Sequence, residues 1–188
     1  MLHIVNLEEI QGMLLQVPRL IDSLERRDPK FADAVKEWLM QAEQVLISNR
    51  LAVAAEIAVL RGVLISAERG VIPPGVVFSD RTTRRKIRDA SAAGVLRKAE
   101  ELLSNAIRVD AAQLAEGERL TRQMVAVAQR KGLILVTPTV DEHSEMLKAI
   151  WRTMIVDPEL GPATTHLAGL VGVHDALILL DRMLLVLE

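Results

Sequence analysis

Hydrophobic residues recur every three or four positions along most of the chain, which is the spacing of one face of an α-helix. Turn residues interrupt this pattern at 70–75 and 132–138. The pattern therefore predicts an all-α fold, a bundle of six to seven helices in one domain of residues 1–188, with a possible subdivision near 70–80. We expect the helices at 7–27 (bent near Pro18), 29–48, 50–69, 89–108, 110–131, 140–156 and 163–187.

Two of these segments have the composition of central helices. Residues 51–67 are apolar nearly all round, which is typical of a buried helix. Both segments carry a row of small residues at four-residue steps, which lets another backbone approach closely: Ala54, Ala58, Gly62 and Ser66 in the first, Ala168, Gly172 and Ala176 in the second. We expect both helices inside the bundle, and their mutual packing is an attractive hypothesis.

Local signals refine the boundaries. Asp28-Pro29 and Asp157-Pro158 each place a capping carboxylate before a proline, which is suited to the start of a helix. The short apolar segments 76–78 and 133–136 are candidates for extended structure, and even for a minor two-stranded β element.

Composition excludes the functions that depend on cysteine and argues against a secreted or membrane-spanning protein. Half of the residues are hydrophobic, yet Phe31, Phe78, Trp38 and Trp151 are the only aromatic residues, and Cys and Tyr are absent. Disulfides, thiolate metal sites and a cysteine nucleophile are therefore excluded. No basic signal-peptide region precedes Glu8 and Glu9, and the most apolar stretch is too short to span a bilayer. We expect a cytoplasmic protein without membrane contact, and the positive mean hydropathy favours a homo-oligomer.

The most unusual feature is a cationic stretch at 81–88. Five of its eight residues are positive in a chain of net charge −2: Arg81, Arg84, Arg85, Lys86 and Arg88. On a helix the four arginines share one face. That face becomes apolar after Ala92, so we expect the arginines to be displayed rather than buried, because burying unpaired arginines is prohibitively costly.

Two interpretations of this stretch remain open. The cations either pair with local carboxylates such as Asp80 and Asp89, or they bind an anion, meaning a phosphate or an acidic partner surface. Aromatic residues are not interleaved with the cations, which argues against binding of single-stranded nucleic acid by base stacking.

A second candidate lies at 114–134. Leu114-Ala115-Glu116, Leu120-Thr121-Arg122, Val125 and Gly132-Leu133-Ile134 together resemble the helix-turn-helix pattern of bacterial repressors. The resemblance implies that Thr121 caps a recognition helix and that Arg122, Gln123 and Arg130 contact DNA. Arg119 occupies the position of the tight-turn glycine, however, and the alternative is one continuous amphipathic helix over 111–131.

Catalytic and metal signatures are missing from the sequence. The phosphate-binding loop, the dinucleotide glycine fingerprint, the nucleophile elbow and the helical zinc and di-iron motifs do not occur. His174 and Asp181 lie two turns apart on the last predicted helix and could seat a ligand, whereas His143 is expected to point away from its acidic neighbours. We therefore predict no catalytic residues, no metal ligands and no cofactor.

The leading hypothesis is a non-enzymatic helical protein that acts through protein contacts, as a homo-oligomer, and engages an acidic partner or a phosphate through the stretch at 81–88. The alternatives are a DNA-binding regulator that uses 110–131, and a small-ligand or enzymatic pocket near His174 and Asp181.

Overall fold

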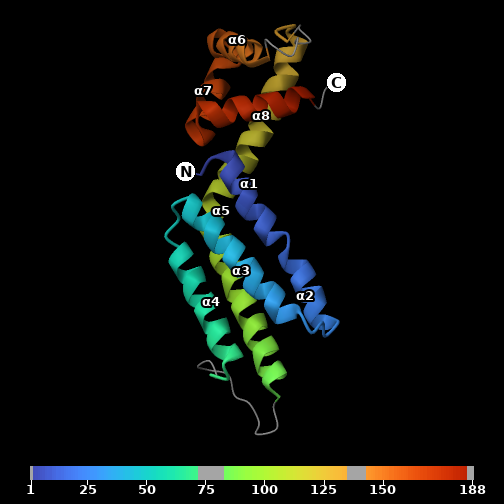
Figure 1. Ribbon diagram of the computed structural model, residues 1–188. Coiled ribbons are helices and arrows are strands. Elements are labelled where there is room, and N and C mark those ends of the chain that lie inside the picture. Colours follow the sequence, from blue (N-terminus) through green and yellow to red (C-terminus); the bar gives the residue numbers. More distant parts are fainter. Residues whose placement is uncertain (1, 72–82, 135–142, 186–188) are drawn as a thin grey trace. The chain divides into compact units, whose positions relative to one another are not determined.

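A computed structural model describes residues 2–71, 83–134 and 143–185 of the chain. Within these ranges all regular structure is helical, as predicted (Figure 1). The helices are α1 (Ile4–Leu14), α2 (Val17–Glu25), α3 (Phe31–Ser48), α4 (Ala54–Glu68), α5 (Arg84–Arg130), α6 (His143–Val156), α7 (Gly161–Val171) and α8 (Val173–Leu185). The proposed extended segment 76–78 and residues 135–136 of the segment 133–136 lie outside the described residues.

The chain divides into two compact units, one made chiefly of residues 4–108 and the other of residues 109–188. We call them the N-terminal and the C-terminal unit. The boundary falls inside α5, which contributes its first half to one unit and its second half to the other. The possible subdivision near 70–80 stays a prediction, because residues 72–82 lie outside the described ranges. None of the helices in the described ranges is long and apolar enough to cross a membrane.

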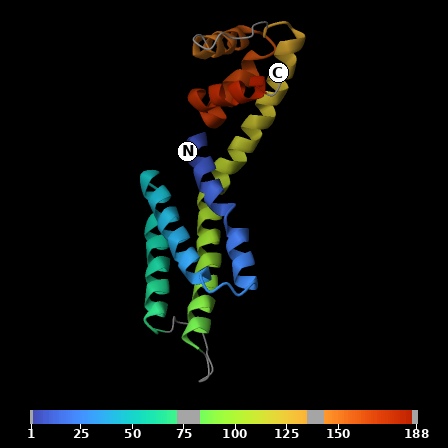
Figure 2. The same ribbon diagram turned by 45° about the vertical axis from the view of Figure 1, so that its right-hand side comes forward.

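In the N-terminal unit, α3 packs against α1, α2 and α4, and the first half of α5 lies along the same bundle (Figures 1 and 2). Buried residues recur on α3 at helical spacing, which gives it a continuous apolar face: Phe31, Val35, Trp38, Leu39, Ala42 and Leu46. The indole Nε1 of Trp38 donates a buried hydrogen bond of 3.0 Å to the carbonyl of Met13. This bond fixes the end of α1 against α3.

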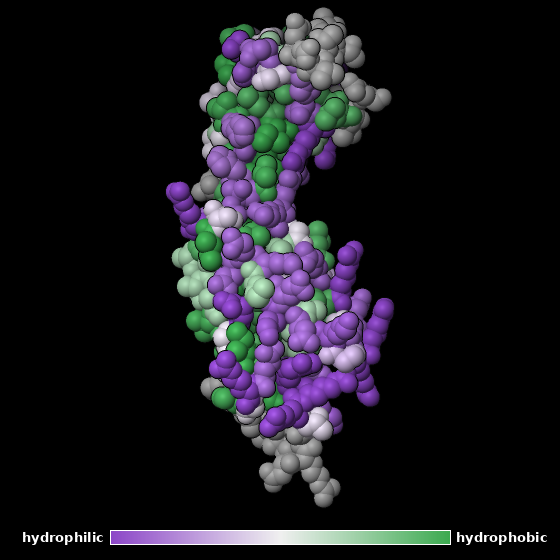
Figure 3. Space-filling view, viewed as in Figure 1, coloured by the Kyte–Doolittle hydropathy of each residue, from purple (hydrophilic) through white to green (hydrophobic). Residues whose placement is uncertain are grey.

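The prediction that α4 is a buried central helix is wrong. It buries one face, with Ala54, Ile57, Leu64 and Ala67, while Val59 is 67% exposed. Space is open beside Gly62, so the small-residue row does not receive another helix of the unit along its length. Arg61 is accommodated at the edge of the buried face, where its Nε donates to Glu43 of α3 at 2.8 Å. Hydrophobic residues of this surface are visible over α4 in Figure 3.

In the C-terminal unit, α6, α7 and α8 pack on one another. The single helix predicted over 163–187 is two helices, because the chain turns at Gly172 with a φ of 82°. A left-handed backbone conformation of this kind favours glycine and ends α7. The two proposed central helices thus belong to different units: α4 to one, α7 and α8 to the other.

Helix α5 is the largest departure from the predicted boundaries. The sequence predicts separate helices at 89–108 and 110–131, with Asp110 as the cap of the second, but a single helix runs through all of them. Neither proline nor a left-handed glycine lies near Asp110, and the flanking residues are good helix formers, so nothing breaks the helix there. Left-handed glycines do occur just after the ends of α4 and α5, at Gly70 and Gly132, as the turn signals predicted.

Candidate anion-binding site

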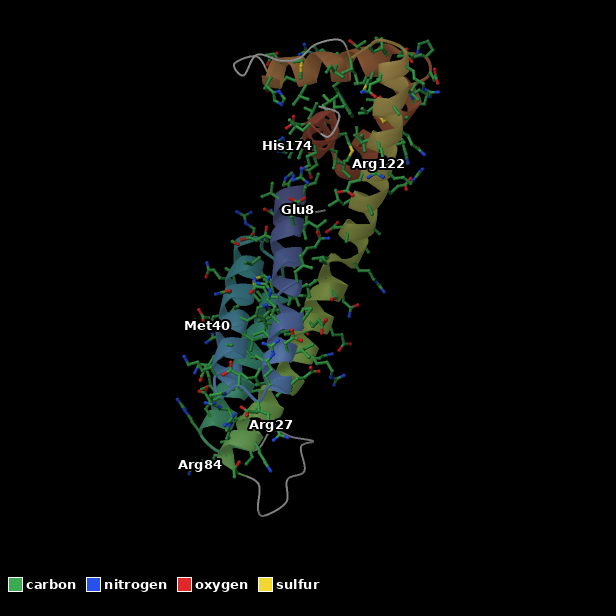
Figure 4. The ribbon with its side chains drawn as sticks, turned by 90° about the vertical axis from the view of Figure 1, so that its right-hand side faces the viewer. Glu8, Arg27, Met40, Arg84, Arg122 and His174 are labelled. Carbon is green, nitrogen blue, oxygen red and sulfur yellow. The ribbon has the colours of Figure 1, made fainter. Side chains whose placement is uncertain are left out.

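Residues 84–88 of the cationic stretch lie at the start of α5. Arg84, Arg85 and Lys86 are exposed, whereas the side chain of Arg88 retains only 26% of its accessible surface. Arg81 lies outside the described residues. Figure 4 shows Arg84 at the same end of the N-terminal unit as Arg27, which belongs to the turn between α2 and α3.

Two of the arginines bind this turn rather than pointing away from the molecule. Arg85 Nη2 donates to the carbonyl of Arg27 at 2.6 Å, and Arg88 Nη2 donates to the carbonyl of Pro29 at 2.9 Å. Their other contacts are carboxylates: Arg85 Nε lies 3.4 Å from Asp89, and Arg88 Nη1 lies 3.7 Å from Asp33. Arg85 is therefore exposed, as predicted, and it faces Asp89, whereas Arg88 is partly buried. Both guanidinium groups are anchored to carbonyls of the same unit, although Arg88 Nε has no hydrogen-bond partner among the described residues.

The turn between α2 and α3 has carbonyls to offer because its backbone leaves the helical path. Arg27 adopts a φ of 56°, and the amides of Arg27 and Asp28 bond back to Leu24 and Ser23 in the pattern that closes a helix C-terminus. Asp28 then accepts the amide of Lys30 at 2.8 Å in the turn before α3. The N-cap of α3 is Lys30, which makes no side-chain capping bond, so Asp28 closes the preceding turn rather than capping the helix as predicted. Carbonyls beyond these bonds need outside donors, and the two arginines supply them.

Two clefts flank Arg85, which lines both. The α4-side cleft has a volume of about 560 Å³, and its charged lining comes from α3, α4 and α5: Asp33, Lys36, Glu68, Arg84, Arg85 and Arg88. The α2-side cleft has a volume of about 650 Å³. Its apolar lining consists of Leu24, Phe31, Ala90 and Ala93, and its charged lining of Arg27, Asp28, Arg85, Lys86 and Asp89. Together they place six cationic and four anionic side chains around one surface.

Each of the four anionic side chains has a partner within its own unit, although Asp89 Oδ1 accepts no hydrogen bond from the described residues. Glu68 accepts both its hydrogen bonds from Lys36 at 3.0 Å, and Asp28 is occupied by the backbone of α3. Asp33 and Asp89 face Arg88 and Arg85. Among the side chains that the structure describes, Arg27, Arg84 and Lys86 have no carboxylate partner. These three cations are the part of the surface that an anion would meet, and we call them the free cations.

Of the free cations, Arg84 and Lys86 belong to the predicted site and Arg27 does not. The sequence does carry a signal for a charged turn, because Arg26-Arg27 directly precedes Asp28-Pro29. Its closeness to the start of α5 depends on the packing of distant helices.

The helix-turn-helix alternative is wrong in its geometry. It needs a turn between Glu116 and Leu120, but α5 is unbroken there. Thr121, the expected cap, is buried, and its hydroxyl donates to the carbonyl of Gly117 one turn earlier at 2.7 Å. Gly117 itself is covered by α7 and α8, since a Cβ on it would lie 3.0 Å from Val171 and 3.2 Å from Leu179.

The proposed DNA contacts lie on the outer face of this continuous helix. Arg122, Gln123 and Arg130 are all exposed, and Figure 4 shows Arg122 on α5. The amide oxygen of Gln123 accepts a hydrogen bond of 3.2 Å from Arg119.

The histidine candidates are arranged differently from the prediction. Asp181 of α8 bonds to His143 Nε2 of α6 at 2.5 Å, a pairing between distant helices that the sequence did not predict. This contact ties the start of α6 to α8 within the C-terminal unit. His174 is exposed in the first turn of α8. Across the described ranges, no group of three or more His, Asp or Glu side chains is placed to hold a metal ion.

An ion pair in the C-terminal unit perturbs the pKa values of its two partners. Lys131 Nζ donates to both oxygens of Asp157, at 2.7 and 2.8 Å, and lies 3.1 Å from Glu159. Asp157 also accepts the amides of Glu159 and Leu160, in the turn that precedes α7. The ammonium group and these amides lower the pKa of Asp157, and the same bond raises the pKa of Lys131.

Comparisons with known proteins give no further constraint on the site. No protein-family model matches the chain, and neither the curated proteins nor the solved structures contain a match.

Proposed function

We propose that this protein is a helical binding protein that captures an acidic segment of a partner protein at the clefts beside Arg85. The observation that supports this function is that the cations of this region fall into two groups, one that holds the fold and one that is available to a ligand. Arg85 and Arg88 hold the turn between α2 and α3, which fixes the clefts, while the free cations beside them lack carboxylate partners among the described residues. A fixed scaffold with unpaired arginine and lysine groups suits carboxylate recognition.

Poly-L-glutamate, labelled for fluorescence anisotropy, is the probe for this function. We expect binding at low ionic strength that weakens as salt is added, because exposed charge interactions are screened within about 10 Å at 0.1 M salt. The double variant Arg84→Glu/Lys86→Glu should weaken binding at least tenfold. Neither residue makes a contact that holds the turn, so the variant should unfold at the same urea concentration as the parent.

The control is Arg122→Glu/Arg130→Glu, which changes the net charge by the same amount on an exposed face of α5. Its affinity for poly-L-glutamate should stay within about twofold of the parent's. Equal losses in the two variants would mean that only net charge matters, and would refute the site. If duplex DNA binds more tightly than poly-L-glutamate, and Arg122→Glu/Arg130→Glu abolishes that binding, the DNA hypothesis replaces this one.

We further propose that the protein self-associates, and the uncovered surface of α4 supports this. Val59 and Gly62 lie on a face without an internal partner in the described part of the N-terminal unit. Sedimentation should then give a mass above 20.8 kDa, and Val59→Glu should return the protein to the monomer. A monomer at every accessible concentration would refute self-association.

A further inference from the structure

The α2-side cleft combines an apolar floor with a cationic rim, and this combination is more specific than a charged surface. Leu24 comes from the end of α2, and Ala90 and Ala93 come from the second and third turns of α5. Both alanines are too small to fill the space between the two elements, and Ala90 is exposed. The cleft therefore offers apolar surface that the chain itself leaves accessible to solvent.

Three cations and two carboxylates line the cleft beside this floor, and the carboxylates, Asp28 and Asp89, face the Lys30 amide and Arg85. Arg27 stands on the side of the turn and Lys86 on the side of α5, and both are free cations. Arg84, the third free cation, is two residues away from Lys86 along the helix and lines the α4-side cleft. An occupant that places an apolar side chain over Ala90 and Ala93 would bring its neighbouring groups to these cations. Charge complementarity then requires those neighbours to be anionic.

From this arrangement we propose that the partner's acidic segment carries one aliphatic anchor residue, which inserts into the α2-side cleft while carboxylates on either side of it bind the free cations. The proposal rests on the proposed function and specifies its ligand. The anchor supplies affinity through burial of apolar surface, and the carboxylates fix its register. A volume of about 650 Å³ accommodates one such side chain with part of its backbone.

The test compares two fluorescein-labelled peptides, Glu-Glu-Leu-Glu-Glu and Glu-Glu-Ala-Glu-Glu, by anisotropy. The peptide with leucine should bind about tenfold more tightly, which corresponds to burial of about two methylene groups. Arg84→Glu/Lys86→Glu should weaken both peptides by the same factor, because the carboxylates are common to them.

The decisive variant is Ala90→Leu, which fills the cleft with a residue of high helix propensity. It should reduce the tenfold preference for the leucine peptide to about one, with little change for the alanine peptide. Ala106→Leu is the control, because Ala106 is an exposed alanine of the same helix that does not line the cleft. This variant should keep the preference.

Each alternative result has a separate meaning. Equal affinity of the two peptides for the parent, with the charge dependence intact, would overturn the anchor and leave the proposed function standing. If Ala90→Leu still prefers the leucine peptide over the alanine peptide, the leucine of the peptide binds outside the α2-side cleft, which overturns the proposal. A change of oligomeric state in Ala90→Leu would show that a second copy of the chain fills the cleft, which also overturns it. Absence of binding by both peptides at low salt would refute the anchor and the proposed function together.

Discussion

Two glycines of α7 should respond in opposite ways to the same substitution. Gly161 is buried at the first position of the helix, and a Cβ built on it would lie 2.6 Å from the carbonyl oxygen of Ile155. Close carbon–oxygen contacts normally lie at about 3.3 Å or more. The obstacle is backbone rather than the end of a flexible side chain, so α7 must shift relative to the end of α6 to admit the methyl group. Gly169, two turns later, is exposed and has open space around it.

The magnitudes follow from this difference. Gly169→Ala should stabilise the C-terminal unit by about 1 kcal/mol, which is the helix propensity of alanine over glycine. Gly161→Ala gains little propensity at a first helical position and must displace packed backbone, which costs about 1–3 kcal/mol. The free energies of unfolding of the two variants should therefore differ by about 2–4 kcal/mol.

The chain provides its own probe for this measurement. It has two tryptophans and no tyrosine, with Trp38 in α3 and Trp151 in α6, so each unit contains one indole. In a Trp38→Phe background, the fluorescence of Trp151 reports urea unfolding of the C-terminal unit alone. Parallel shifts of the midpoint at constant slope would give the two free-energy changes. A Gly161→Ala variant as stable as its parent would refute the close approach of the Ile155 carbonyl.

Three further predictions concern stability. Arg88→Met should destabilise the N-terminal unit by about 1–2 kcal/mol, because the carbonyl of Pro29 loses its charged donor, while Arg84→Met should stay within about 0.5 kcal/mol. Urea unfolding followed by the fluorescence of Trp38 in a Trp151→Phe background would distinguish the two variants. Equal losses of stability would contradict the claim that Arg88 holds the turn and Arg84 does not. Arg50 follows the end of α3 with a left-handed φ of 56°, which glycine adopts more readily, so Arg50→Gly should stabilise this unit by about 0.5–1 kcal/mol. Arg69 has a φ of −82°, so Arg69→Gly should not stabilise it. Because the pKa of Asp157 is lowered on folding, its carboxylate stabilises the C-terminal unit above the ordinary pKa of 3.8, and this contribution disappears as the pH falls through the folded value. At neutral pH, Asp157→Asn should thus unfold at a lower urea concentration than the parent, and the two midpoints should converge well below pH 3.8. A difference between the midpoints that does not change with pH would contradict stabilisation of the carboxylate by Lys131.

The helical class and most helix ends were predictable because they depend on local chemistry. Asp28 and Asp157 accept amides of the turns that lead into α3 and α7, close to the predicted helix starts, and Gly70 and Gly132 follow helix ends with left-handed backbone. The burial of α4 was not predictable from its composition. A helix that is apolar all round can bury any face, and which one it buries depends on α3. The continuity of α5 was missed because Asp110 has the residue type of a cap, although no breaking residue accompanies it.

The difference between local chemistry and the packing of distant elements also decides how the cationic stretch should be interpreted. Sequence shows five positive charges within eight residues, but it cannot separate those that support the fold from those that remain available. The separation depends on Arg27 and Pro29, whose carbonyls come from a turn more than fifty positions earlier in the chain. Neutralising the whole stretch would therefore confuse loss of the turn with loss of binding. Only substitutions confined to the free cations Arg84 and Lys86 leave Arg85 and Arg88 in place, and only these can show whether the clefts bind a ligand.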